Sequence, residues 1–109
     1  MRAGELDRRI EIRTAAVSTN ELNEPVETWI PAVTVKAKVM PISDGERFRA
    51  GEVSAQITTR FLIRWSITTS EITPKDRIVY GGKTFDIFHL KEIGRREGIE
   101  ISAAARADQ

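Results

Sequence analysis

Residues 57–67 read ITTRFLIRWSI, a run in which apolar and polar side chains alternate. Phe61, Ile63 and Trp65 fall on one side, and Arg60 and Arg64 fall on the other. A period of two residues is typical of a strand with one buried face. The segment therefore predicts a strand. Its one exception is an apolar residue on the polar side, Leu62, for which we favour incidental exposure over contact with a neighbouring subunit.

Towards the C-terminus, two further strand patterns flank a pair of glycines, RIVY at 77–80 and KTFDIFHL at 83–90. Gly81-Gly82 between such runs predicts a two-residue hairpin turn, because glycine readily adopts a positive φ angle. A second turn is expected at 94–98, followed by a last short strand around Ile99 and Ile101. Residues 103–109 are expected to be a tail.

Towards the N-terminus, alternation at 8–14 predicts one strand. The chain is expected to become extended again from Val26, with a second alternating stretch at 33–39. The polar stretch 18–25 between them is expected to be a solvated connection. Trp29 is expected to fill a gap in the core or an interface. Together the patterns predict an all-β chain: a small closed β-barrel or sandwich of about six strands, forming a single domain over residues 1–109.

One segment interrupts this pattern. Residues 43–55 are rich in charge and contain two glycines, and they predict either a long inserted loop or a short helix. A plain surface excursion and a binding loop are equally consistent with the sequence. The candidate site residues in this segment are Asp44, Gly45, Glu46, Arg47, Phe48, Arg49, Gly51 and Glu52.

The composition argues against several classes of function. Seventeen basic and 16 acidic residues give a net charge of +1 with no basic run, which disfavours a dedicated nucleic-acid-binding protein. The lack of cysteine excludes disulfides, thiolate metal sites and thiol nucleophiles. The single histidine, His89, is expected to be structural. We therefore expect no catalytic residues, no metal and no cofactor, and neither an export signal nor a membrane span.

Several short motifs, taken in order, resemble a known family. They are AGELDRRI at 3–10, VETW at 26–29, VKAKV at 35–39, DGE at 44–46, FLIRW at 61–65, ITPKDRIVY at 72–80 and GKTFDI at 82–87. Their order and spacing resemble the head-tail joining proteins, the stoppers or connectors of long-tailed phages and of gene transfer agents. One departure is Trp65, where the family usually has tyrosine.

The resemblance implies a structural virion protein of the phage neck, made in the cytoplasm of the bacterial host. Its copies would form a ring, six-fold in preference to twelve-fold, between an adaptor on the portal side and the tail terminator and tail tube on the other. The loop at 43–55 would act as a gate in the channel and retain packaged double-stranded DNA without sequence preference. Pairing of Glu46 and Glu52 with Arg47 and Arg49 around the ring would suit this role.

Two alternatives remain open from the sequence. One is a tail terminator of the same neck, and the other is a small β-barrel module that binds nucleic acid or peptide. An enzyme is a distant third.

Overall fold

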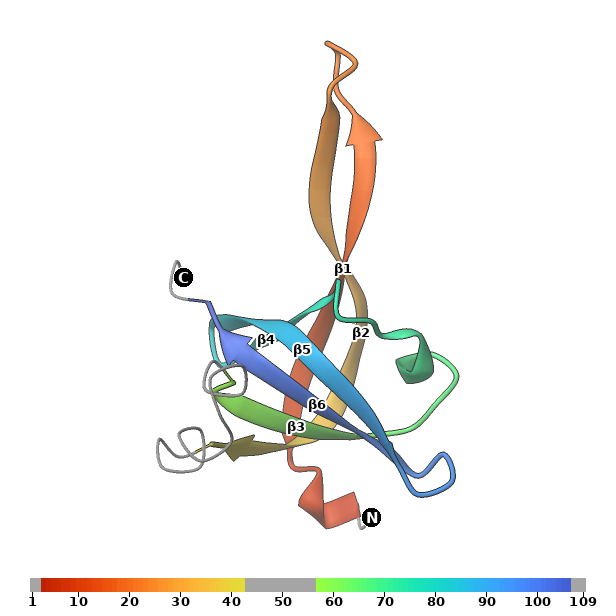
Figure 1. Cartoon of the computed structure of the whole chain (residues 1–109), viewed down its shortest axis with the longest axis vertical. Helices are drawn as coiled ribbons and strands as arrows, with labels where there is room; N and C mark the ends of the chain where they lie inside the picture. The colour runs from red at the N-terminus through yellow and green to blue at the C-terminus, as the bar shows by residue number, and fades with distance from the viewer. Residues whose placement is uncertain (1–2, 43–56, 107–109) are drawn as a thin grey trace.

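The chain forms a closed antiparallel β-barrel, which confirms the predicted fold class (Figure 1). The structure is a computed structural model that describes residues 3–42 and 57–106. The six strands pair around the barrel in the order β1-β2-β3-β6-β5-β4. They are β1 (Arg8–Thr19), β2 (Pro25–Pro41), β3 (Thr59–Arg64), β4 (Arg77–Tyr80), β5 (Lys83–Ile93) and β6 (Gly98–Ala105). Two short 3-10 turns accompany them, η1 (Ala3–Glu5) and η3 (Thr69–Glu71).

The barrel interior is filled by the apolar side of each strand, as the alternation predicts. Phe61 and Ile63 of β3 are fully buried, whereas Arg64 is exposed and Leu62 is half-buried. The Phe61 ring meets the Phe85 ring edge to face at a centroid distance of 5.1 Å. Such pairs add to the free energy gained by burying their apolar surface. The largest fully buried side chains are those of Phe61, Ile10, Ile12, Ile63, Ile78 and Ile101.

The glycine pair turns the chain between β4 and β5, as predicted. Gly81 and Gly82 have φ angles of 61° and 77°, which a residue with a Cβ atom adopts only with strain. The turn sets the register of the hairpin, in which Tyr80 pairs with Lys83. The turn expected at 94–98 is also present between β5 and β6.

Some strand boundaries differ from the sequence prediction. The first strand continues to Thr19 instead of ending near Thr14. The second begins at Pro25, one residue before the predicted return to extended structure at Val26. The connection expected at 18–25 is therefore shorter than predicted, and residues 20–24 form it. The tail expected from residue 103 is also wrong in part, because β6 runs to Ala105 and Ala103 is fully buried. Small residues are needed there, since Ala103 lies between Thr59 and Ile87.

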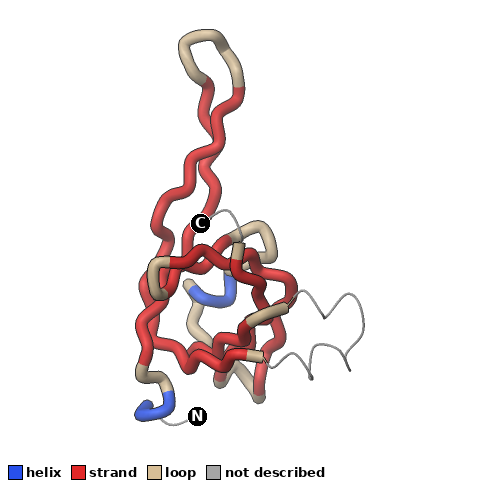
Figure 2. The backbone as a smooth tube through the Cα atoms, turned by 90° about the vertical axis from the view of Figure 1, so that its left-hand side faces the viewer, coloured by secondary structure: helices blue, strands red, loops and turns tan. Residues whose placement is uncertain are grey.

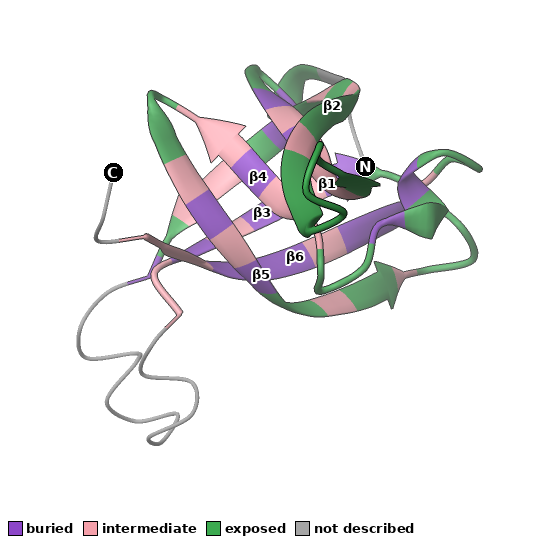
Figure 3. Ribbon diagram, turned by 90° about the horizontal axis from the view of Figure 1, so that it is seen from above, coloured by how far each residue is buried: buried purple, intermediate pink, exposed green. Residues whose placement is uncertain are grey.

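The extra length of β1 and β2 gives the molecule an elongated shape. Figures 1 and 2 show the two strands leaving the barrel together as a long hairpin that stands clear of every other strand. The molecule measures 47 × 32 × 24 Å along its principal axes. Viewed from above, buried positions gather in the barrel, and the projecting hairpin is largely exposed (Figure 3).

A matched pair of substitutions tests the assignment of the core. Phe61→Ala should lower the free energy of unfolding by about 3–5 kcal/mol, because it leaves a cavity in the centre of the barrel. Phe88→Ala, at a position that is 39% exposed, should cost about 1 kcal/mol or less. Urea unfolding of the two variants measures the difference. Equal losses would show that Phe61 does not organise the core.

Candidate functional site

The eight site residues predicted from the sequence lie outside the described part of the chain. They are Asp44, Gly45, Glu46, Arg47, Phe48, Arg49, Gly51 and Glu52. Their predicted role therefore stays a prediction, as does the choice between loop and short helix at 43–55. What the structure does describe is the attachment of this segment to the barrel at both ends.

Both attachment points are held by the strand ladder. Pro41 at the end of β2 pairs with Thr59 at the start of β3, and the Ile42 amide donates to the Thr58 carbonyl over 2.9 Å. The Thr58 hydroxyl in turn accepts a hydrogen bond from the Ala105 amide at 3.0 Å. Residue 42 and residue 58 are therefore neighbours, and the segment between them leaves and returns at one point of the barrel wall.

The projecting hairpin is the main exposed feature that the sequence did not predict. We call residues 14–30 the β1–β2 arm. Its base is defined by pairing, because β1 contacts β4 only from Glu11 to Arg13 and β2 contacts β3 only from Ala37 onwards. A register shift between Ile12 and Arg13 lies where the arm leaves the barrel. Such irregularities bend a strand and increase its local twist.

A series of charged contacts links the base of the arm to the barrel. The Arg77 guanidinium lies 4.0 Å from the centroid of the Trp29 ring. Arg77 Nε is 3.4 Å from Asp86, and Arg106 Nη1 donates to both oxygens of Asp86 at 3.0 and 3.1 Å. Trp29 is thus half-buried at the base of the arm rather than part of the core cluster. The contact with Arg77 fixes one face of the arm against the barrel.

The tip of the arm is a small ordered turn. The Asn20 side-chain oxygen accepts hydrogen bonds from the amides of Leu22 and Glu24 at 2.9 and 3.0 Å. The backbone closes the same turn, since the Asn20 amide donates to the Glu24 carbonyl at 3.0 Å. Asn23 takes the left-handed conformation with φ 60°, which asparagine tolerates better than most residues. The tip therefore has a defined backbone conformation.

The arm combines exposed apolar side chains with acidic ones. Val17 and Leu22 are 70% and 75% exposed. Three glutamates, Glu21, Glu24 and Glu27, lie in the arm, and no lysine or arginine occurs between Arg13 and Lys36. An isolated two-stranded hairpin is only marginally stable in water. Exposed apolar groups on such a hairpin commonly mark interaction sites. The sequence signal for this arm was the uncharged run 14–19 followed by the polar turn.

Other classes of site find little support in the described residues. Within 3–42 and 57–106, no group of three or more His, Cys, Asp or Glu side chains could hold a metal ion. His89 is exposed beside a register shift of β5 rather than placed in a polar cluster. Neither of the two helical turns in the described ranges is long and apolar enough to span a membrane. The arm is therefore the strongest candidate among the described features.

Two sequence comparisons find phage head completion proteins, and two solved structures share the fold of this chain. The sequence model of the family described as phage head completion protein matches residues 1–106. Head completion protein gp7 of Enterobacteria phage HK97 is 32% identical over 78 residues, which is 72% of this chain and 67% of that protein. The solution structure of protein SF1141 from Shigella flexneri 2a matches over the whole of both chains, with a TM-score of 0.79 and 25% identity. A chain in the virion of a native gene transfer agent particle has the same fold, with a TM-score of 0.61, 23% identity, and coverage of 90% of this chain and 92% of that one.

The order of the arm tip depends on one side chain and can be tested there. Asn20→Ala removes the acceptor for two amides, so the order parameters of Leu22 and Glu24 should fall from about 0.85 towards 0.6 or below. Asn20→Asp keeps a side-chain oxygen and should preserve them. NMR relaxation of the backbone amides measures both variants. If the alanine variant keeps an ordered tip, the backbone alone defines the turn.

Proposed function

The chain belongs to the phage head completion protein family, and on that premise we propose that it joins head to tail as a ring-forming stopper. Membership confirms the resemblance seen in the motifs and makes the chain a structural component of the virion. The observation that carries the proposal is the extent of the family match, residues 1–106. We treat residues 1–109 as one joining domain.

A closed barrel suits a ring wall. Closure leaves no open sheet edge in the barrel, so neighbouring copies meet through side chains and projections rather than by uncontrolled strand pairing. A ring of identical copies uses one heterologous contact repeated around an axis. We propose six copies in preference to twelve, with an adaptor on the portal side and the tail terminator and tail tube on the other.

The segment 43–55 would supply the gate in the channel of this ring. Its support is the attachment described above, because residues 42 and 58 are hydrogen-bonded to each other and to the barrel. A segment whose two ends are both anchored by hydrogen bonds to the barrel can change conformation without opening the barrel. Asp44, Gly45, Glu46, Arg47, Phe48, Arg49, Gly51 and Glu52 would line the channel and restrain the packaged DNA by position, without reading its sequence.

This role requires no chemical step. The family is named for a structural task, the completion of the phage head, and the work proposed here is binding, closure and docking. No residue of the chain is assigned to catalysis.

Deletion of residues 47–53 tests the gate. The barrel should stay folded, because the deletion leaves both attachment points intact. Particles assembled with this variant should lose packaged DNA or fail to join tails. Nuclease sensitivity of the packaged DNA and electron microscopy of tail attachment measure the two outcomes.

A control variant replaces 47–53 with glycine and serine at unchanged length. If the side chains restrain the DNA, this variant should also leak, and if only the length matters it should retain DNA. Normal DNA retention and normal infectivity after the deletion would refute the gate.

A further inference from the structure

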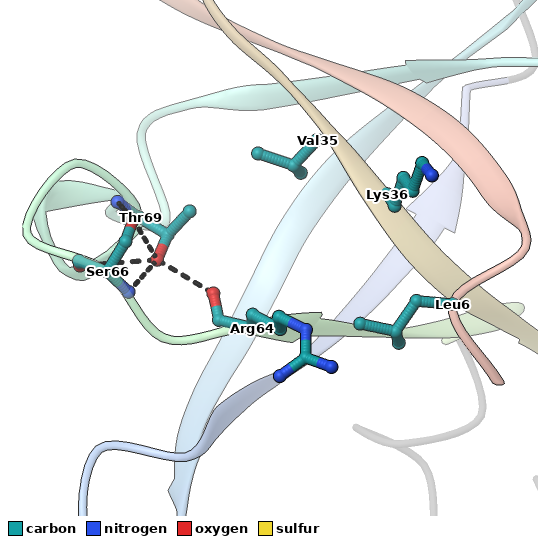
Figure 4. A pocket seen from close by; sticks show the side chains of 6 residues that line it. All are labelled: Leu6, Val35, Lys36, Arg64, Ser66 and Thr69. Carbon is teal, nitrogen blue, oxygen red and sulfur yellow. Dashed lines mark hydrogen bonds between the residues drawn. The ribbon is translucent and has the colours of Figure 1, made fainter. Parts of the chain in front are cut away.

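A hollow of about 420 Å³ opens beside Leu6, which precedes β1. It is lined by Leu6, Val35, Lys36, Arg64, Ser66 and Thr69 (Figure 4). Its volume lies within the range of about 300–1,000 Å³ that is common for binding pockets. Leu6 is 3% exposed and Val35 is half-buried, and both are directed towards the side formed by Ser66 and Thr69 (Figure 4). The hollow thus has an apolar interior.

Hydrogen bonds hold one wall of the hollow in place. The Thr69 hydroxyl donates to the Arg64 carbonyl at 3.0 Å and accepts from the Ser66 amide at 2.7 Å. The Thr69 amide donates to the Ser66 hydroxyl at 3.0 Å. Because Thr69 is 2% exposed, these bonds are shielded from water. The wall is therefore formed before anything binds.

The rim of the hollow is basic and partly apolar. Lys36 and Arg64 are exposed, and neither forms an ion pair with another residue in the described part of the chain. Ile67, which follows Ser66 in the chain, is an apolar side chain that is 75% exposed. An apolar interior with cations at its edge fits an apolar side chain that is flanked by carboxylates.

The arm tip has that composition. Leu22 stands 75% exposed between Glu21 and Glu24, and the Asn20 hydrogen bonds fix the turn that carries all three. Among the described residues, neither glutamate is ion-paired. A preordered tip loses little conformational freedom when it binds. The arm tip and the hollow are thus complementary surfaces on separate parts of the chain.

We propose that in the assembled ring the arm tip of each copy docks into this hollow on the neighbouring copy. Leu22 enters between Leu6 and Val35, and Glu21 and Glu24 face Lys36 and Arg64. The contact is heterologous, because the arm tip and the hollow are different surfaces. Such contacts generate a closed ring when the rotation between copies brings the last copy back to the first. The inference rests on the proposed ring and names the surfaces that hold it together.

Cysteine cross-linking in assembled particles tests the contact directly, since the chain has no cysteine of its own. Particles are built from a mixture of Leu22→Cys carrying an affinity tag and Ser66→Cys without one, and are then oxidised. A covalent dimer that contains both variants is expected, because a disulfide requires Cα atoms about 4.4–6.8 Å apart. The mixture ensures that the bond joins two different copies.

Val17→Cys is the matched control, because Val17 is as exposed as Leu22 but lies on the shaft of the arm. Mixed with Ser66→Cys, it should give no dimer or at least tenfold less. Lys36→Cys replaces Ser66→Cys if the latter loses the hydrogen bonds of the wall and fails to fold, and it should cross-link to Leu22→Cys in the same way.

Charge exchange gives an independent readout. Glu21→Lys with Glu24→Lys should reduce incorporation into particles, as should Lys36→Glu with Arg64→Glu. All four substitutions together should restore most of the loss, because the pairing is then re-formed with opposite signs. Additive losses without restoration would overturn the inference.

The outcomes separate this inference from the proposed function. A ring without the 22–66 dimer overturns the docking contact and leaves the stopper role standing. A dimer of Leu22→Cys with another neck protein also overturns the docking contact, because the arm tip then binds a different protein and not a second copy. Particles in which this chain forms no ring contradict the proposed function itself.

Discussion

The antiparallel pairing of β1 with β2 is the interaction on which the rest of the structure depends. The same ladder does two things along its length. From Arg8 to Arg13 it forms part of the barrel wall, and from Thr14 to Thr19 it forms the arm. Because β1 also pairs with β4 over Glu11–Arg13, loss of the β1–β2 register would open the barrel and remove the arm together. The register shift next to Ile12 lets one hairpin serve both purposes.

The barrel keeps the two projecting parts of the chain independent. The arm starts from one part of the β1–β2 ladder, and the segment 43–56 starts from the far end of β2, where Pro41 pairs with Thr59. Between them stands a core of isoleucine and phenylalanine side chains. A rigid, close-packed interior of this kind allows one projection to bind or move without rearranging the other. That separation suits the proposed role, in which the arm would hold a neighbouring copy while the segment 43–55 gates the channel.

The sequence predicted the barrel well because burial there follows strand periodicity. Phe61 and Ile63 alternate with Arg60 and Arg64, and only the inner face is filled, so a period of two reports the fold directly. The arm was missed because residues 17–28 are exposed, so no buried face imposes alternation on them.

The two candidate sites also differ in how far the sequence reveals them. The interruption at 43–55 was visible in the sequence and its role remains a prediction. The hollow was not visible, because Leu6, Val35, Arg64 and Thr69 come together only when the barrel closes. Its basic rim likewise joins Lys36 of β2 to Arg64 of β3. Such a site depends on contacts between distant parts of the chain, which local patterns do not encode.

We infer that the barrel is a fixed wall and that the parts projecting from it make the contacts with neighbouring copies and with the channel. A cryo-electron microscopy reconstruction of the neck in intact particles tests this most directly. We expect a closed ring of copies whose barrels match the structure described here, with each arm lying on the adjacent copy and residues 43–55 facing the channel. A reconstruction in which the barrels are remodelled, or in which the arms point into solvent and 43–55 faces outwards, would contradict the account.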